Sequence, residues 1–188
     1  MSSVATGIQA ALLLARGRPD GLDLLSQKPI AAIRAAALSF WAIAFALPGF
    51  VALHLMDWVI SGKPSGVGRG FAQDLLGFVI GWLAFALLSH RVAEITGRVA
   101  LWPRFITAWN WCNVIQYLML VAATLPGLLG LPAFIGQMCW LVAIFWALWL
   151  EFFTTRLALA MPFKGALAMV ALDFGLGIAI VFIIAGFN

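Results

Sequence analysis

The sequence predicts an all-α, polytopic membrane protein: a bundle of five transmembrane helices with a cytoplasmic N-terminus and a C-terminus on the far side. Of its 188 residues, 64% are hydrophobic and 10% are charged, whereas an ordinary soluble domain carries about a quarter charged residues. The mean hydropathy is +1.07. A chain this apolar cannot cover a surface that faces water, so the lipid bilayer must be its solvent.

The transmembrane helices are predicted from the intervals between cations, because Lys and Arg are costly at the centre of a bilayer. Three cation-free intervals of 28, 21 and 24 residues can each hold one helix of roughly 20 residues. A fourth interval, between Arg104 and Arg156, has 51 residues and a Pro/Gly-rich middle, which indicates two helices joined by a tight turn. The expected helices are 35–60, 71–90, 106–128, 133–153 and 166–186.

Residues 1–34 are expected to form an N-terminal segment at the cytoplasmic interface, followed by the transmembrane domain over 35–188. Ser3 can cap a short helix running to Ala15, Gly17 can end it, and Pro29 suits the first turn leading into the first span. Two interpretations stay open for this segment. It is either a docking element at the membrane surface or an apolar lead-in lying on the headgroups.

The orientation is predicted from the positive-inside rule. Nine cations fall on one side of the expected helices and two on the other, so the richer side is assigned to the cytoplasm. This distribution orients the chain and forms no basic stripe, so we expect no nucleic-acid partner. The nine are Arg16, Arg18, Lys28, Arg34, Arg91, Arg98, Arg104, Arg156 and Lys164, and the two are Lys63 and Arg69.

Polar residues inside the expected spans are the candidate functional residues, because each costs energy and must find a partner. Asp173 lies 9 residues beyond Lys164, roughly 13 Å into the last helix at 1.5 Å per residue. Asn113 lies 9 residues beyond Arg104, so the two should lie at the same depth. We predict an intramembrane polar cluster in the cytoplasmic half, made of Asp173, Asn110, Asn113, Gln116, Glu151 and Arg156.

Two interpretations of this cluster remain open. Interhelical hydrogen bonds in membranes contribute on the order of 1 kcal/mol each and select which helix faces meet, so the cluster can be structural. It can instead be a proton or cation site, with Asp173 as its centre. The absence of further acids leading into the outer leaflet favours the structural interpretation.

Searches for catalytic and cofactor motifs find none in a suitable context, so no enzymatic activity, metal or cofactor is expected. His54 and His90 should lie at opposite ends of their helices, which excludes a haem held by both. Cys112 and Cys139 are too few for a disulfide framework and should be free thiols, both buried as small apolar residues. His54 is expected to take part in interfacial ion pairing with Asp57 and Asp74.

Small residues recur at helical spacing in two of the spans. Gly77 and Gly81 make a GxxxG pattern, and Ala171, Gly175 and Ala179 form a ridge on the last helix. Such surfaces let helix backbones approach closely. They serve either packing within the chain or contact with another membrane protein or a second copy.

The five-helix pattern, with a cytoplasmic N-terminus and a short outer C-terminus, resembles the Yip-type family of small membrane proteins. Residues 108–116 (AWNWCNVIQ), 150–159 (LEFFTTRLAL) and 170–173 (VALD) are similar to stretches of uncharacterised bacterial inner-membrane relatives of that family. The resemblance covers roughly residues 70–186. It implies a bacterial inner-membrane location, a periplasmic C-terminus and a membrane-organising or trafficking role without enzymatic activity.

The function predicted first is a non-enzymatic integral membrane protein: an adaptor, an assembly factor or an accessory subunit of an inner-membrane complex. The alternative is a small transporter or channel that uses the polar cluster around Asp173. A lipid-modifying enzyme is a third possibility. It would need reactive groups gathered at one interface, where only Glu151, His90 and Arg91 come near one another.

Overall fold

The computed structural model describes residues 3–25, 28–62 and 67–186, and within these ranges the chain is helical without strands. Five segments are long and apolar enough to span a membrane, which confirms the predicted all-α architecture of five transmembrane helices. These segments are Pro29–Ser61, Gly70–Ile95, Val99–Leu128, Ala133–Ala158 and Phe163–Ile184.

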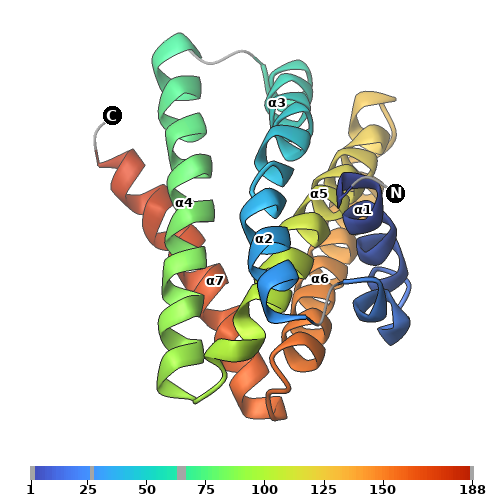
Figure 1. Ribbon diagram of the computed structural model, residues 1–188. Helices are drawn as coiled ribbons and strands as arrows, with labels where there is room; N and C mark the ends of the chain where they lie inside the picture. Colours follow the sequence, from blue (N-terminus) through green and yellow to red (C-terminus); the bar gives the residue numbers. More distant parts are fainter. Residues whose placement is uncertain (1–2, 26–27, 63–66, 187–188) are drawn as a thin grey trace.

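Short elements precede and link the long helices (Figure 1). The order is α1 (Ser3–Leu14), the 3-10 turn η1 (Pro19–Leu24), α2 (Pro29–Ser39), α3 (Ala42–Ser61), α4 (Val67–Ile95), the 3-10 turn η2 (Val99–Leu101), α5 (Trp102–Leu128), α6 (Ala133–Ala158) and α7 (Phe163–Ala185).

The first span consists of two helices, α2 and α3, with a break at Phe40 and Trp41. Pro29 occupies the first turn of α2, as the sequence predicts, because its fixed φ suits that position and its missing N–H would have no intrahelical partner there. The span therefore begins six residues before the predicted start at 35. The predicted boundary between residues 34 and 35 falls inside α2.

The other helices continue past the cations that were used to bound them. α4 extends to Ile95 beyond Arg91, and α6 extends to Ala158 beyond Arg156. α5 begins at Trp102, before Arg104. A long cationic side chain can reach the headgroups from inside a helix end, so cations mark the limits of the apolar core rather than the ends of the helices.

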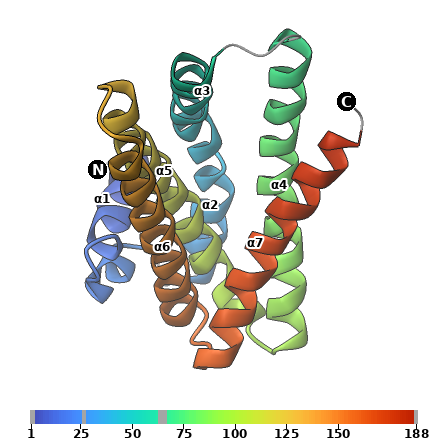
Figure 2. The ribbon, with the colours of Figure 1, turned by 180° about the vertical axis from the view of Figure 1, so that it is seen from behind.

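α5 is the central helix of the bundle. It packs against α1, α2, α3 and α6, while α7 packs against α4 and α6. All residues from Phe105 to Cys112 are buried. A helix covered on every side needs no polar face, which explains why this stretch has no amphipathic pattern. Figure 2 shows α7 running diagonally across α4.

The turns alternate between the two ends of the bundle (Figure 1). The α4–α5 and α6–α7 connections lie at one end, and the α5–α6 turn lies at the other. In the α5–α6 turn, α5 ends at Leu128, Gly130 has a φ of +69°, and Pro132 precedes α6. Glycine adopts this left-handed backbone without the steric cost of a Cβ, so the predicted Pro/Gly turn is confirmed.

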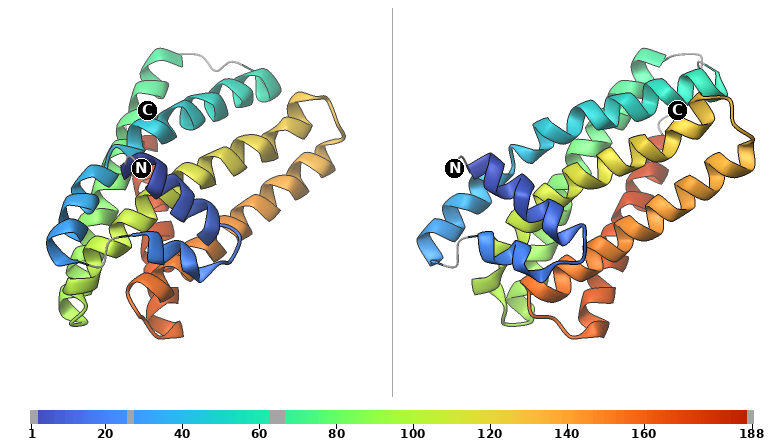
Figure 3. Two further views of the ribbon diagram at one scale, coloured as in Figure 1. Left: turned by 45° about the vertical axis from the view of Figure 1, so that its right-hand side comes forward. Right: turned by 90° about the vertical axis from the view of Figure 1, so that its right-hand side faces the viewer.

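The N-terminal segment is docked on the bundle. Figure 3 shows α1 lying across α5, and Ala10, Ala11 and Leu14 are at most 1% exposed. α1 ends at Leu14 and is followed by Gly17, whose φ of +74° suits the predicted stop. This segment therefore packs against the protein itself.

Arg104 of α5 contacts η1 and holds it against the bundle. Its guanidinium donates a hydrogen bond of 3.0 Å to the backbone carbonyl of Leu22 and lies 3.7 Å from the carboxylate of Asp23. At the start of η1, the exposed Arg18 guanidinium hydrogen-bonds Asp20 and holds the pKa of that carboxyl below its usual value. The contacts of Arg104 bind the N-terminal segment to the centre of the bundle.

The α1–α5 contact depends on Gly7. A Cβ at this position would overlap the indole of Trp111, which is 3% exposed. We expect Gly7→Leu to release α1, with a loss of docking free energy of about 1–3 kcal/mol from overpacking. Limited trypsin digestion should then cut faster after the exposed Arg16.

The control for this variant is Gly68→Leu, because nothing lies within 4 Å of a Cβ at Gly68. Equal trypsin cleavage of the Gly7→Leu and Gly68→Leu proteins would show that α1 is not held by this contact.

Candidate functional site

Asn110 joins three helices at the centre of the bundle. Its side chain is fully buried, its Oδ1 accepts a hydrogen bond of 2.7 Å from the Trp82 indole of α4, and its Nδ2 donates one of 2.7 Å to the Ser39 hydroxyl of α2. Ser39 in turn donates to the Ala36 carbonyl at 2.7 Å. The amide is engaged on both of its polar atoms by α2 and α4, so it acts as a structural bridge.

The other two amides of α5 also bond to backbone carbonyls. The Nδ2 of Asn113 donates to the carbonyl of Trp109, one turn earlier in the same helix, at 3.0 Å. The Nε2 of Gln116 donates to the carbonyl of Ala147 in α6, also at 3.0 Å. Gln116 therefore bridges two helices, whereas the described bond of Asn113 is local.

Glu151 and Asp173 form a carboxyl pair at the contact of α6 with α7. Glu151 is 6% exposed, Asp173 is half-buried, and the two carboxyl groups interact directly. Tyr117 of α5 is the next titratable neighbour of Asp173. The structure thus brings two of the predicted cluster residues together and adds Tyr117, which the sequence analysis did not select.

Two buried oxygen atoms, one in this pair and one a helical turn away on α6, lack a hydrogen-bond partner among the described residues. They are Oε1 of Glu151 and Oγ1 of Thr155, which is 0% exposed. Residues four apart lie on the same face of a helix, so both atoms belong to the surface that α6 presents to its neighbours. Buried polar atoms are rarely left unpaired in native proteins, which makes this part of α6 the strongest candidate site.

Arg156 lies apart from the pair. It is exposed, and among the described residues no ion pair joins it to Glu151 or Asp173. Its position in the last turn of α6 allows its side chain to extend toward the headgroups. The predicted cluster is therefore divided in space: Asn110 faces α2 and α4, Arg156 faces outward, and Glu151 meets Asp173.

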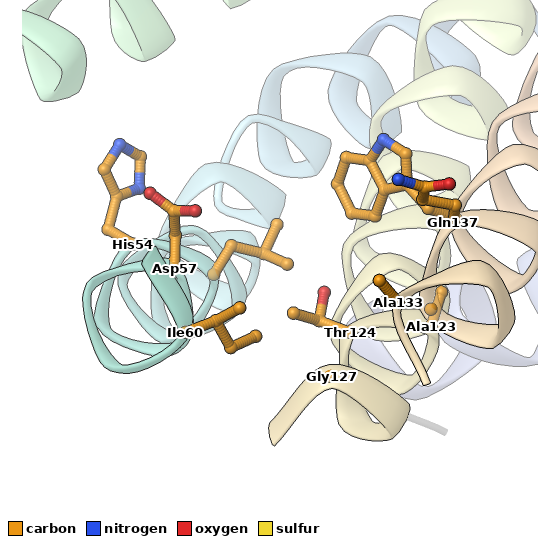
Figure 4. A pocket seen from close by; sticks show the side chains of 11 residues that line it. His54, Asp57, Ile60, Ala123, Thr124, Gly127, Ala133 and Gln137 are labelled. Atoms are coloured by element: carbon orange, nitrogen blue, oxygen red, sulfur yellow. The ribbon is translucent and has the colours of Figure 1, made fainter. Parts of the chain in front are cut away.

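A cavity of about 670 Å³ lies elsewhere, toward the end of the bundle that holds the α5–α6 turn. Figure 4 shows His54 and Asp57 of α3 on one wall, with Thr124 of α5 and Gln137 of α6 on the opposite wall. The rest of the lining is mostly apolar: Leu53, Ile60, Ala123, Gly127, Ala133, Gly136 and Trp140. Neither Glu151 nor Asp173 lines it.

The two histidines lie at different ends of the bundle. His54 Nε2 is 3.3 Å from Asp74 Oδ2, and His90 is 3.5 Å from Glu94 on α4. Asp74 and His90 are 16 residues apart on α4, or about 24 Å along its axis. Asp57 accepts a hydrogen bond from Ser61. The predicted pairing of His54 therefore occurs with Asp74, whereas Asp57 bonds within α3.

The described residues show no group of three or more His, Cys, Asp or Glu side chains that could hold a metal ion. Both cysteines are free thiols, as predicted. Cys112 is buried, as expected, with its sulfur 3.7 Å from the Thr154 hydroxyl. Cys139 is only half-buried, so the expectation that both thiols are buried is wrong for this residue.

The two small-residue surfaces have different surroundings. A Cβ on Gly77 would lie 2.5 Å from Ile184 Cδ1, and one on Gly81 would lie 3.2 Å from Ile180 Cδ1. The α4 pattern therefore serves packing against α7. On α7, Ala171, Gly175 and Ala179 are exposed, and nothing lies within 4 Å of a Cβ on Gly175.

Sequence reasoning did not identify Trp82 and Ser39 as the partners of Asn110. Each residue type is common in membrane helices, and the only signal in the sequence is that both can form a hydrogen bond from an otherwise apolar segment.

No protein-family model, no curated protein and no solved structure matches this chain.

Proposed function

We propose that this chain is a non-enzymatic protein of the bacterial inner membrane, which acts as an adaptor, an assembly factor or an accessory subunit of a membrane complex. The proposal includes a cytoplasmic N-terminus, a periplasmic C-terminus and kinship with the Yip-type family. The observation that carries it is the uncovered small-residue face of α7, formed by Ala171, Gly175 and Ala179.

This face is available for a partner because neither principal neighbour of α7 covers it. α7 packs only against α4 and α6 among its principal contacts, and Ile180 and Ile184 fill the space over the α4 glycines. Small residues spaced four apart let a second helix approach closely in lipid, where dispersion contacts and weak hydrogen bonds drive association. A partner helix, from another membrane protein or a second copy, fits this face.

The polar groups of α5 support a structural role for the interior. The described hydrogen bonds of Asn110, Asn113 and Gln116 all go to protein groups within the bundle. These bonds fix the helix faces that meet. A bundle with a hydrogen-bonded interior and an uncovered small-residue face on α7 is suited to assembly with other membrane proteins.

Purification in mild detergent tests the proposal. We expect the chain to self-associate or to retain a stable membrane partner, and Gly175→Leu should abolish that association. Gly177→Leu is the matched control, because Gly177 also has nothing within 4 Å of a Cβ and lies about 200° around the helix from Gly175. A lone monomer, or an equal effect of both variants, would contradict the proposal.

A small transporter or channel is the second candidate, and the Glu151–Asp173 pair favours it. Intramembrane carboxyl groups mark ion and proton pathways in many transporters, and Glu151 has an unpartnered oxygen. The test is proton- or cation-dependent flux in liposomes that contain the purified chain. Flux that is lost in a folded Asp173→Asn variant would reverse the ranking of the two functions.

A further inference from the structure

Among the residues that the structure describes, no cation forms an ion pair with Glu151 or Asp173. Arg156, the nearest cation along α6, is exposed and forms no ion pair with either carboxyl within the described ranges. From α5, the titratable group near the pair is the phenol of Tyr117, which carries no positive charge. The pair is therefore an acidic site without a counter-charge.

The charged groups of the other neighbouring elements are engaged elsewhere. On α4, which also packs against α7, Asp74 contacts His54, and Glu94 contacts both His90 and Arg91. On η1, which touches α6, Asp23 lies near Arg104. None of these groups forms an ion pair with Glu151 or Asp173.

Two neighbouring carboxyl groups in such a setting cannot both ionise. Like charges in contact repel each other strongly, and burial in an apolar medium disfavours each charge further. Pairs of this kind hold one proton between them, as in sites where two carboxyls act together. A second independent feature points to a ligand: Thr155 is fully buried one turn along the same face of α6, and its hydroxyl oxygen has no described partner.

We propose that Glu151 and Asp173 form a proton-binding site in which one proton is shared between the two carboxyl groups, with the Thr155 hydroxyl beside it. The shared proton leaves the pair with one negative charge instead of two. The buried Oε1 of Glu151 has no described hydrogen-bond partner, so no protein group competes with the shared proton for it. The inference goes beyond the proposed assembly role and does not depend on it.

The test uses dicyclohexylcarbodiimide, an apolar reagent that reacts with protonated carboxyl groups in apolar surroundings. The purified full-length chain is labelled in liposomes over a range of pH and analysed by intact mass and peptide mapping. We expect one modification per chain at neutral pH, located at Glu151 or Asp173. Above the midpoint of the titration, labelling should fall about tenfold per pH unit, as the proton is lost.

The variants are chosen to keep the shape of the site. The double variant Glu151→Gln, Asp173→Asn should abolish the labelling, whereas the double variant Asp57→Asn, Asp74→Asn should leave it unchanged. If the first variant does not fold, peptide mapping of the unmodified protein still decides the question. Labelling at other carboxyl groups only, or none at all, would overturn the proposal.

A bound monovalent cation is the competing occupant of the pair, and the same assay separates the two. Labelling at fixed pH is compared in sodium chloride and in choline chloride at equal ionic strength. Equal labelling supports the shared proton, and protection by sodium would overturn it in favour of a cation site. The assay uses the isolated chain, so its failure is distinct from failure of the partner-binding experiment.

Discussion

Replacing Asn110 by alanine should destabilise the bundle more than any other single polar substitution in the spans. The change removes the acceptor of Trp82 and the donor to Ser39 at a position with no exposed surface. Lost interhelical bonds, an unpaired buried indole N–H and a small cavity together cost about 2–4 kcal/mol. The free energy of unfolding in mixed detergent micelles measures this loss.

Asn113→Ala is the control, because the described hydrogen bond of Asn113 stays within α5. It should cost under about 1 kcal/mol. A double-mutant cycle of Asn110→Ala with Ser39→Ala should show a coupling of about 0.5–1.5 kcal/mol, since the two side chains bond directly. Equal losses for Asn110→Ala and Asn113→Ala, with additive effects in the cycle, would refute the bridging role of Asn110.

The second large effect is expected at Gly77, where α4 and α7 approach closely. A leucine would drive its side chain into Ile180 and Ile184, whose nearest atoms lie 3.1 and 2.5 Å from a Cβ at this position. Gly177→Leu on α7 is the reference, because nothing lies within 4 Å of a Cβ at Gly177. Both variants gain the same helix propensity, so the difference between their unfolding free energies isolates overpacking, at about 1–3 kcal/mol.

Thermal unfolding of the two variants in one detergent measures this difference. The Gly77→Leu protein should unfold at the lower temperature. Equal stability of the two variants, or a less stable Gly177→Leu protein, would show that the α4 glycines do not set the α4–α7 distance.

The number of spans was predictable because the physical cost behind it is large. Cations are excluded from the bilayer centre, so their positions, together with the Pro/Gly-rich turn inside the 51-residue interval, divide the chain into the five segments observed. The ends of the helices were less predictable. Arg91 and Arg156 lie within helices, since flexible side chains separate the position of the charge from the position of the backbone.

The polar cluster was predicted from depth, and depth does not fix the direction in which a side chain points. Asn110 was grouped with Asp173 because both lie in the cytoplasmic half of the expected spans, yet its amide faces Ser39 and Trp82. Glu151 and Asp173 lie on consecutive helices joined by a short turn. Because α6 and α7 are antiparallel neighbours, residues at the same depth in the two helices lie side by side, and Glu151 therefore meets Asp173.

The docking of α1 on α5 was not predictable from its own composition. An apolar helix at an N-terminus suits both a membrane surface and a protein surface. What distinguishes the two is the close contact of Gly7 with the Trp111 indole. This contact joins residues far apart in the sequence, so it is seen only in the folded structure.

The central claim is that the chain crosses the membrane five times, with the cation-bearing turns on the cytoplasmic face. Single cysteines at Ala100, in the α4–α5 turn, and at Leu129, in the α5–α6 turn, test it in a background that lacks Cys112 and Cys139; both positions are exposed. An impermeant maleimide applied to intact cells should label Leu129→Cys and leave Ala100→Cys unlabelled until the membrane is opened. Labelling of both positions from the same face would contradict the account.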